Sequence, residues 1–383
     1  MQFKYLVMIA AAFLIISCGS KKEQTEVVDG VKIIKNGNAP SDRNVNIKTD
    51  FLFDLNEDTG DTSAVIRTIS SIEVDEKGYI YILDRRKSTV FKFSPEGSLI
   101  KTFGQRGTGP GEMARPEQVL VSNDTVYVTD MRQRKVIIFD NEGAYVKDVI
   151  PLRGNGFPRN ISKVTEEKFA GVLFGSGGRG GPGNRTMSIN FSLLDSRFEK
   201  IADMVSEQFE IDGNNFNPMD HDNKFTTGGG KIYYAENTED KILVNVFDSE
   251  GKKIEEIRKS YAKVMYSDLE RQKFKERAER DFRWREFDAS TLRYKKSVEN
   301  IFWHDDGYLL LECARKTDEK ERTNFVVDIY RDGVYLNTSD LNRNDPEFYS
   351  NDDGFVKILR GDKLFVYNED DNIISVYRIK ITQ

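Results

Sequence analysis

The residue types that most often carry chemistry are scarce in this sequence of 383 residues. It contains two histidines, His221 and His304, and two cysteines, Cys18 and Cys313. These counts exclude a zinc centre with three histidines, a zinc site with four cysteines and an iron–sulfur cluster. The formal net charge of −6 argues against nucleic-acid binding, because proteins that neutralise phosphates carry an excess of basic residues. The composition therefore favours a binding role over catalysis.

One segment nevertheless places carboxylates on both sides of an imidazole. Asp220, His221 and Asp222 are consecutive, and they precede a run that we expect to be the innermost strand of a sheet near a central axis. Carboxylates and imidazole are metal ligands and proton carriers, so one hypothesis for this segment is a site for a divalent metal or for acid/base chemistry. The other hypothesis is a solvated loop.

Charged side chains recur in four loops that each separate two predicted strands. Two of these loops are basic, and they contain Arg85, Arg86, Arg132 and Arg134. The other two are acidic, and they contain Glu236, Glu239, Glu369 and Asp370. If all four lie on one face of the protein, that face is basic on one side and acidic on the other. Such a field orients a partner that carries both charges, such as a peptide or a protein surface. The alternative is that turns are simply polar.

A sequence repeat defines the elements that hold the two basic loops. Eight residues recur 46 positions later: Tyr81, Asp84, Arg86, Val90, Phe93, Glu96, Gly97 and Lys101 reappear as Tyr127, Asp130, Arg132, Val136, Phe139, Glu142, Gly143 and Lys147. Within each unit, short runs of β-branched and aromatic residues alternate with turns that contain glycine, which predicts antiparallel strands joined by hairpins. Four strands in a unit of this length are typical of a propeller blade.

Weaker copies of the same strand pattern continue to the end of the sequence and bring the count to six blades. The sixth unit supplies only three strands, at residues 355–359, 363–367 and 373–379. We expect an upstream strand, at residues 31–34 or 45–52, to complete this blade, because a bare sheet edge would otherwise remain. The sequence thus predicts an all-β protein, a six-bladed β-propeller of four-stranded antiparallel blades over residues 31–383, closed by an N-terminal strand.

A helical insertion of about residues 267–296 is expected between blades four and five. Ser267 and Glu270 fit a capping box, and an approximate apolar stripe follows them. The insertion contains ten Lys or Arg and seven Asp or Glu residues, with Trp284 and Phe287 adding aromatic surface. It either docks to a partner or to an anionic membrane surface, or caps the rim of the ring.

The N-terminal residues have the organisation of a secretory signal. Lys4 precedes an apolar run at residues 5–16, which is shorter than the about 20 residues that span a bilayer. We therefore expect a signal peptide at residues 1–17 and no transmembrane helix in the mature chain. The sequence Ile-Ile-Ser-Cys at residues 15–18 resembles a bacterial lipobox, which implies a covalent lipid on Cys18 and a polar tether at residues 18–30.

Two further expectations follow from this lipobox resemblance. Gly19 is not the Asp that resembles an inner-membrane retention signal, so we expect an outer-membrane lipoprotein. No clear acidic cluster follows Cys18, which favours the periplasmic side, with exposure at the cell surface as the alternative. Cys313 lies in an apolar run and has no partner once Cys18 is acylated, so we expect it to be a small buried hydrophobe.

The linker between the first two blades resembles the linkers of NHL repeats. It contains glycines at positions 104, 107, 109 and 111, and it is followed by Pro116, Val119 and the run Tyr-Val-Thr-Asp at residues 127–130. The whole chain is similar to the six-bladed, TolB-like propeller lipoproteins of Gram-negative bacteria. This resemblance implies a module of the cell envelope that binds or scaffolds a protein, a peptide or another polar ligand on one propeller face.

The alternative function is a metal-dependent propeller hydrolase or lyase, similar to lactonases, with a divalent cation held by oxygen and imidazole ligands at the axis. No nucleophile motif supports it. Apart from the lipid on Cys18, we expect no cofactor unless this alternative holds.

Overall fold

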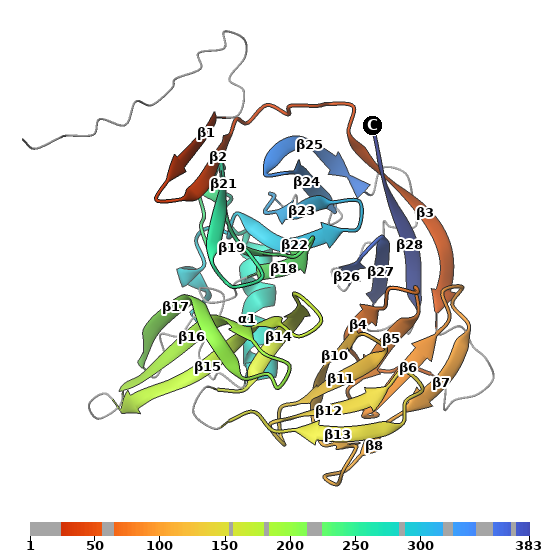
Figure 1. Cartoon of the computed structure of the whole chain (residues 1–383). Helices are drawn as coiled ribbons and strands as arrows, with labels where there is room; N and C mark the ends of the chain where they lie inside the picture. The colour runs from red at the N-terminus through yellow and green to blue at the C-terminus, as the bar shows by residue number, and fades with distance from the viewer. Residues whose placement is uncertain are drawn as a thin grey trace, which may run out of the picture.

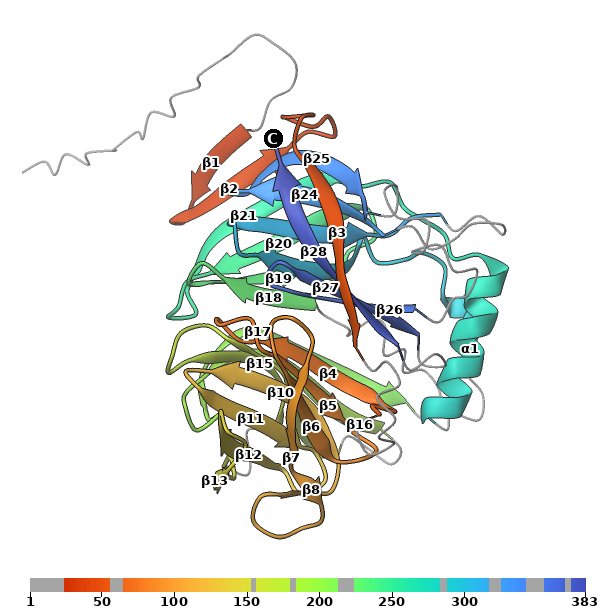
Figure 2. The same cartoon turned by 90° about the vertical axis from the view of Figure 1, so that its right-hand side faces the viewer.

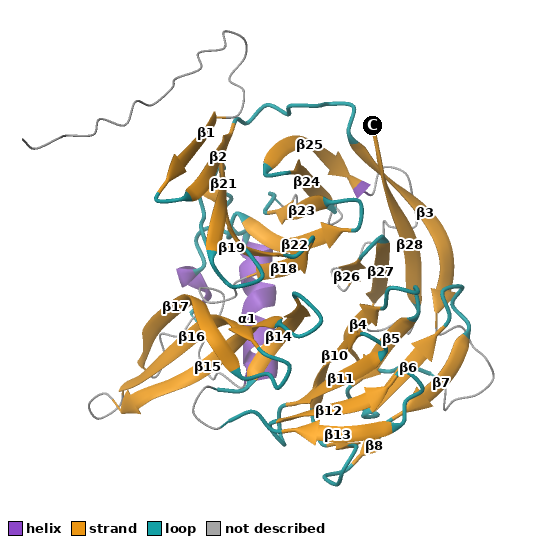
Figure 3. Ribbon diagram, in the orientation of Figure 1, coloured by secondary structure: helices purple, strands orange, loops and turns teal. Residues whose placement is uncertain are grey.

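Six sheets are arranged around one central axis in the computed structural model (Figure 1). The structure describes residues 24–55, 65–152, 156–179, 184–212, 224–282, 288–316, 325–341, 355–368 and 373–383. Each sheet contains four antiparallel strands that are hydrogen-bonded in order, and one sheet carries two additional strands at its edge. The predicted six-bladed β-propeller is confirmed. Figure 3 shows how completely strands dominate the described part of the chain.

The first three blades each use four strands that are consecutive in the sequence. Blade one consists of β4 (Ile69–Val74), β5 (Ile80–Asp84), β6 (Thr89–Phe93) and β7 (Leu99–Phe103). A parallel pair of short strands, β8 (Gln105–Arg106) and β9 (Glu112–Met113), lies in the linker to the next blade. Blade two consists of β10 (Pro116–Ser122), β11 (Thr125–Asp130), β12 (Lys135–Asp140) and β13 (Tyr145–Val149). Blade three consists of β14 (Pro158–Lys163), β15 (Phe169–Arg179), β16 (Asn184–Leu194) and β17 (Lys200–Asp212).

The other three blades complete the ring. Blade four consists of β18 (Lys224–Gly228), β19 (Lys231–Ala235), β20 (Lys241–Phe247) and β21 (Lys253–Ser260). Blade five consists of β22 (Val298–His304), β23 (Tyr308–Cys313), β24 (Val326–Arg331) and β25 (Val334–Asp340). Blade six consists of β26 (Phe355–Arg360), β27 (Lys363–Asn368), β28 (Ile374–Thr382) and β3 (Asn46–Leu55). The first strand of every blade is the innermost, and these first strands contact one another around the axis.

Apolar side chains fill the spaces between neighbouring blades. The described residues form one large apolar cluster at each of the six boundaries. At the boundary between blades six and one, for example, Ile82 and Phe91 pack with Phe365. All five residues of β5 are buried, because a neighbouring blade covers each face of the sheet. The ring is therefore held together by burial between sheets rather than by a single central core.

The N-terminal strand β3 closes the ring. It pairs antiparallel with β28 over its length, so the second of the two predicted closing segments, residues 45–52, is the one that completes blade six. Val45 and Ile47 are buried there against blades five and six. Residues 31–34 lie instead in β2 (Val31–Asn36), which pairs parallel with β21 at the outer edge of blade four.

A hairpin stands where the sequence predicted a tether. The sequence assigned residues 18–30 to a polar linker, whereas β1 (Gln24–Val28) pairs antiparallel with β2. Asp29 and Gly30 both have positive φ angles, 51° and 81°, which is the geometry of a two-residue hairpin turn with an Asp-Gly sequence. Residues 24–30 of the predicted tether therefore form a hairpin arm with β2.

The chain between these N-terminal strands follows the rim of the ring. Backbone hydrogen bonds join Ser41 and Asp42 to the carbonyl oxygens of Tyr335 and Leu336 in β25. The N-terminal segment thus contacts blade four through β2, then blade five, and then enters blade six as β3 (Figure 1). We call residues 31–55 the N-terminal belt.

The two faces of the ring differ. Because adjacent strands run in opposite directions, the turns between the first and second strands of all blades emerge on one face, which we call the turn face. Loops between second and third strands, and the connections from one blade to the next, emerge on the opposite face. Helix α1 (Asp268–Phe282) belongs to the connection from β21 to β22, as predicted, so we call this second face the helix face. Figure 1 shows α1 behind the centre of the ring, and Figure 2 shows it on one side.

Helix α1 begins with the predicted capping box. The backbone N–H of Ser267 donates to the Glu270 carboxylate at 2.8 Å, and the N–H of Glu270 donates to the Ser267 hydroxyl at 3.2 Å. Glu270 also pairs with Lys295, which follows the short 3-10 helix η2 (Ala289–Thr291). These contacts fix the first turn of α1 to the body of the insertion. In the part of the chain that the structure describes, no helix has the length and apolar character needed to cross a membrane.

Candidate functional site

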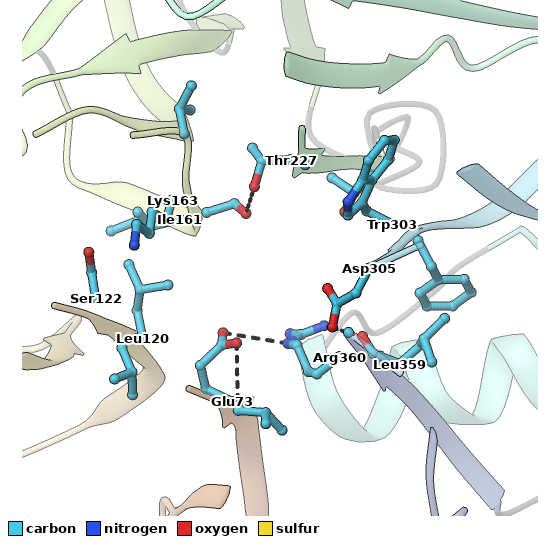
Figure 4. A pocket seen from close by; sticks show the side chains of 18 of the residues that line it. Glu73, Leu120, Ser122, Ile161, Lys163, Thr227, Trp303, Asp305, Leu359 and Arg360 are labelled. Atoms are coloured by element: carbon cyan, nitrogen blue, oxygen red, sulfur yellow. Dashed lines mark hydrogen bonds and ion pairs between the residues drawn. The ribbon is translucent and has the colours of Figure 1, made fainter. Parts of the chain in front are cut away.

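An axial channel of about 950 Å³ runs along the innermost strands. All six blades contribute to its wall, through residues that include Glu73, Gln118, Ser162, Thr227, Trp303 and Arg360. Its lining also includes the turns between first and second strands, so the channel reaches the turn face. Figure 4 shows these side chains around the cavity. A cavity of this volume accommodates a small polar ligand or a short segment of a larger one.

Hydrogen bonds between neighbouring first strands set the spacing of the channel wall. Gln118 of blade two accepts from the backbone N–H of Ile161 at 2.8 Å and donates to its carbonyl oxygen at 2.6 Å. The hydroxyls of Ser162 and Thr227 are 2.6 Å apart and join blade three to blade four (Figure 4). These polar side chains thus join neighbouring blades to one another, which makes the channel wall rigid.

Ion pairs between blades continue this arrangement. Lys77 pairs with Asp124 at 2.7 Å, and Lys163 pairs with Glu76 at 3.1 Å. Both pairs are largely exposed at the turn face, where solvent weakens their interaction. They give the mouth of the channel a mixed charge with no large excess of either sign.

The most enclosed ion pair of the channel wall joins Arg360 to Glu73. The Nε atom of Arg360 lies 3.5 Å from Oε2 of Glu73 and donates to the carbonyl oxygen of Ile72 at 3.1 Å (Figure 4). Burial raises the pKa of Glu73 above its ordinary value, although the Arg360 charge and the backbone N–H of Val74 act against it. The Arg360 guanidinium therefore already interacts with the Glu73 carboxylate and with the backbone next to it.

The indole ring of Trp303 lines the channel and packs against Gly228 and Gly229, which we call the glycine shelf. A Cβ atom on Gly228 would lie 2.1 Å from Cγ of Trp303, so only glycine allows the indole to rest there. Gly229 approaches the same ring, and Tyr233 stacks on it with ring centroids 5.3 Å apart and an interplanar angle of 21°. All three contacts come from blade four. The half-buried indole lines the channel with the rest of its surface.

Asp305 follows on the same wall, two residues after Trp303 (Figure 4). Its Oδ2 atom occupies the space that a Cβ on Gly361 would fill, at 2.5 Å, and Gly361 has a positive φ of 58°. Asp305 is exposed, and partial desolvation raises its pKa against the opposing charge of His304, while the charge of Asp362 adds to the increase. The Asp305 side chain makes no hydrogen bond and no ion pair with any other residue that the structure describes.

A second group of titratable side chains lies toward the helix face. Glu299 is accessible to solvent but surrounded by protein, and this crowding, with the charge of Glu312, raises the pKa of Glu299 to about 7. Burial also raises the pKa of Glu312, despite a hydrogen bond of 2.6 Å from Asn300. Burial lowers the pKa of Lys357, against the charge of Glu312. These residues interact with one another where the first strands begin.

The predicted basic loops are held in place by the repeated aspartates. Asp84 accepts hydrogen bonds from the backbone N–H groups of Arg67 and Lys87, both at 2.8 Å. Asp130 likewise accepts from Arg115 at 3.0 Å and from Arg132 at 2.9 Å. Burial alone would raise the pKa of Asp130, but its backbone hydrogen bonds outweigh this effect and lower it. The buried repeat aspartates therefore fix the shape of these loops.

The structure places all four predicted arginines on the helix face. Arg85, Arg86, Arg132 and Arg134 are exposed, and their side chains make no hydrogen bond or ion pair with the described residues. The basic half of the predicted charged face is thus available to a partner. The residues belong to blades one and two and lie outside the channel wall.

The acidic half is partly engaged within the protein. Glu236 accepts a hydrogen bond of 2.6 Å from Asn245, and Glu239 lies 3.3 Å from Lys263. Glu369 and Asp370 lie outside the described residues. The structure therefore supports a basic surface on blades one and two but leaves less acidic charge on blade four than the sequence implied.

The predicted metal candidates Asp220, His221 and Asp222 lie outside the described residues, as does Cys18. Among the residues that the structure describes, no group of three or more His, Cys, Asp or Glu side chains is placed to hold a metal ion. Cys313 is 1% exposed and packs in the cluster between blades four and five, which confirms the predicted small buried hydrophobe.

The sequence did not single out the channel residues. Glu73, Trp303, Asp305 and Arg360 come from blades one, five and six, and no local spacing connects them. One signal was present: the run Gly228 to Gly230 stands where a first strand meets its turn, and such a run marks close approach of another group.

Comparisons with known proteins agree with the architecture. A family model described as "6-bladed beta-propeller" matches residues 26–304. A Bacteroides fragilis protein described as a candidate exported protein has a solved structure with a TM-score of 0.52 and 13% identity, covering 92% of this chain and 100% of its own. At this identity the likeness shows a shared fold.

Two other solved structures are more distant. A Bacteroides vulgatus protein from a family of unknown function has a TM-score of 0.47 and 9% identity, covering 88% of this chain and 99% of its own. A catalytically inactive virginiamycin B lyase from Staphylococcus aureus, solved with quinupristin, has a TM-score of 0.45 and 10% identity, covering 87% and 99%. No curated protein matches the sequence.

Proposed function

Because the chain belongs to the 6-bladed beta-propeller family, we propose that it is a binding module of the cell envelope that holds a polar ligand in its axial channel. The fold alone does not indicate a catalytic activity, because propellers serve as both enzymes and adaptors. The channel itself carries the proposal: it has a volume of about 950 Å³, charged and polar walls, and a mouth on the turn face.

The chemistry of the wall suits recognition. Most charged side chains near the mouth are paired between blades, as in Lys77–Asp124, Lys163–Glu76 and Arg360–Glu73. Such pairs keep the wall in one geometry before a ligand arrives, and a rigid site loses less entropy on binding. An aromatic ring and a carboxylate without a partner among the described residues then remain to contact the ligand.

The exposed arginines of the helix face provide a second surface. Arg86 and Arg132 occupy equivalent positions in the loops of neighbouring blades, and both loops are fixed by a buried aspartate. Charged residues on rigid loops steer an oppositely charged partner. We assign this surface to a protein or peptide partner in the envelope, while the channel takes the ligand.

The proposed lipid anchor fits the position of the first strand. Cys18 precedes Gln24 by six residues, and a chain of this length spans at most about 20 Å. Strand β1 lies at the outer edge of blade four (Figure 1). A lipid on Cys18 would therefore hold the ring by its rim and leave the turn face and the helix face accessible. The resemblance to TolB-like propeller lipoproteins supports the same location, an outer-membrane lipoprotein that faces the periplasm.

A blocked channel tests the proposal. In a Cys18→Ala background, Thr227→Cys places a thiol on the channel wall, and a bulky maleimide attached after folding fills the cavity without disturbing folding. Amino acids, dipeptides, oligosaccharides and polyamines are then screened by the shift in melting temperature, which reports binding to the folded state.

The unlabelled Thr227→Cys protein is the matched control, and labelled Thr102→Cys controls for a label on the exposed outer strand of blade one. We expect at least one compound to stabilise the unlabelled protein and the Thr102 conjugate but not the Thr227 conjugate. The proposal would be contradicted by a compound that stabilises the Thr227 conjugate as much as the unlabelled protein. It would also be contradicted if no compound of the panel raised the melting temperature.

A further inference from the structure

We propose that Trp303 and Asp305 form a subsite for an organic ammonium group of the ligand. This inference rests on the proposed function, because it names the chemistry that the channel recognises. It starts from one observation: Asp305 lines the channel, yet its carboxylate has no hydrogen bond or ion pair with the described residues.

The geometry brings the two side chains to one part of the wall. They are two residues apart where β22 ends, so their Cα atoms lie within about 7 Å of each other. Figure 4 shows both on the same side of the cavity. The glycine shelf of blade four supports the indole, and Gly361 of blade six makes room for the carboxylate. Three blades therefore cooperate to present these two groups.

The chemistry of the pair suits a cation. An indole ring attracts an ammonium group through its π electrons, more strongly than other aromatic side chains do, and a neighbouring carboxylate adds a direct charge interaction. Partial desolvation disfavours the charged form of Asp305, although the charges of His304 and Lys363 act against this effect. Asp305 is exposed to the channel and forms no ion pair with a described residue, so a bound cation can contact its carboxylate directly.

The cations that line the channel act mainly on other carboxylates. Lys77 pairs with Asp124, and the charges of Lys224 and Lys357 act on Glu312. Arg360 is adjacent in the wall, but its guanidinium pairs with Glu73 and bonds to the carbonyl oxygens of Ile72 and Leu359. Lys163 is paired with Glu76 on the far side of the ring. The carboxylate of Asp305 is thus left for a group that comes from outside.

Trp303 itself reports the binding. The sequence has two tryptophans, and Trp284→Phe leaves Trp303 as the sole source of indole fluorescence. Choline is the cationic probe, and 3,3-dimethylbutan-1-ol is its neutral isostere. Sodium chloride at the same ionic strength controls for salt.

We expect choline to change the Trp303 emission in a saturable way, with an affinity about tenfold higher than that of the neutral isostere. Asp305→Asn should weaken choline binding about fivefold or more, and Gly361→Ala, which displaces the carboxylate, should act in the same direction. Asp306→Asn is the matched control, because Asp306 is the next residue and does not line the channel.

Equal binding of choline and 3,3-dimethylbutan-1-ol, as for a neutral sugar or an apolar ligand, would overturn the ammonium subsite. So would choline binding that is unchanged in Asp305→Asn. Either result leaves the proposed function standing if the channel conjugate at Thr227 still prevents stabilisation by a compound of the panel. Loss of that blocking effect would instead remove the proposed function.

Discussion

The guanidinium of Arg360 lies 3.5 Å from the carboxylate of Glu73, and this contact joins blade six to blade one inside the channel. Blade six is also the blade in which the ring closes, through the pairing of β3 with β28. The ion pair therefore stabilises the channel wall and holds this closing blade to blade one.

Replacing Arg360 should destabilise the protein in a pH-dependent manner. Burial already raises the pKa of Glu73, and without the Arg360 charge this pKa rises further. The charged form of Glu73 then costs more in the folded state, so Arg360→Gln should lower the free energy of unfolding by about 1–2 kcal/mol at pH 8 and by less at pH 5, where the carboxyl is protonated more easily. Urea denaturation at both pH values measures this.

The double variant Arg360→Gln with Glu73→Gln should lose the additional pH dependence that Arg360→Gln introduces, because no carboxylate remains at position 73. Lys380→Ala, which breaks an exposed pair with Asp50, is the control and should change the stability much less, because solvent screens this pair. An Arg360 variant that is equally destabilised at pH 5 and pH 8 would argue that its role is packing alone.

Glu299 should make the stability of the protein fall as the pH rises between about 4.5 and 7. Its pKa is raised to about 7 by burial and by the charge of Glu312, so the folded state holds a proton that the unfolded state has already released in this window. Glu299→Gln should therefore be more stable than the natural protein at pH 8 and nearly equal at pH 4.5. Thermal denaturation across this range checks the expectation, with the exposed turn residue Glu96→Gln as the control.

Gly228→Ala should displace Trp303 from its shelf. The added methyl group would lie 2.1 Å from Cγ of the indole, so the ring or the strand must move, at a cost of about 1–3 kcal/mol. The Trp303 emission of the Trp284→Phe protein should shift. Gly230→Ala is the control: nothing lies within 4 Å of its Cβ position, and it pays only for its positive φ of 73°. An unchanged Trp303 emission in Gly228→Ala would contradict the close packing of the indole on Gly228.

Lys259 and Asp328 form a buried ion pair at the boundary between blades four and five. Their side chains are 2.6 Å apart, with exposed fractions of 8% and 2%, and Thr338 donates a further hydrogen bond of 2.6 Å to the carboxylate. Lys259→Met should destabilise the protein by about 3 kcal/mol because it leaves the carboxylate buried without its main counter-charge. The double variant with Asp328→Leu should recover much of this loss.

The thiol of Cys313 provides a local readout for the same experiment. In the Cys18→Ala protein it is the remaining cysteine, and it is 1% exposed beside this boundary. Lys259→Met should speed its reaction with a thiol reagent, while Lys77→Met, at an exposed pair, should not. A reaction rate unaffected by Lys259→Met would mean that the ion pair does not hold these two blades together.

Cys18→Ala should release the protein from membranes if the lipid anchor is correct. Loss of the acylated cysteine removes the acyl chains that hold the protein to the bilayer, whereas the propeller itself remains intact. Fractionation of cells into soluble and membrane material, with Ser20→Ala as the control, measures the change. A protein that stays with the membrane fraction would show that another contact retains it.

The sequence predicted the fold well because blades carry local signals. The shared residues of blades one and two, such as Asp84 and Asp130, mark equivalent ends of strands, and each pair of strands is joined by a turn with its own residue pattern. The capping box at Ser267 and Glu270 was found for the same reason, since its two partners are three residues apart.

The channel was missed because its residues meet only through the closed ring. Glu73 and Arg360 are almost 300 positions apart in the sequence, and neither belongs to a motif. The hairpin of β1 and β2 is a different case: Asp29 and Gly30 gave a clear turn signal, but the polar neighbourhood favoured a tether. The pairing of β2 with β21, which are far apart in the sequence, holds this segment in the sheet of blade four as part of a hairpin.

The β1–β2 hairpin and the N-terminal belt set the order in which a pull on the N-terminal end would open the structure. A pull on the chain at Gln24 opens the hairpin first at the pair Gln24 and Lys35, so β1 peels from β2 one residue pair at a time. Pulling a single molecule from residue 24 should therefore give a short extension at low force, before the load reaches the pairing of β2 with β21 and then β3. If the proposed lipid on Cys18 holds the protein to a membrane, opening of the hairpin would lengthen the link to that membrane before tension reaches the pairing of β3 with β28 in blade six.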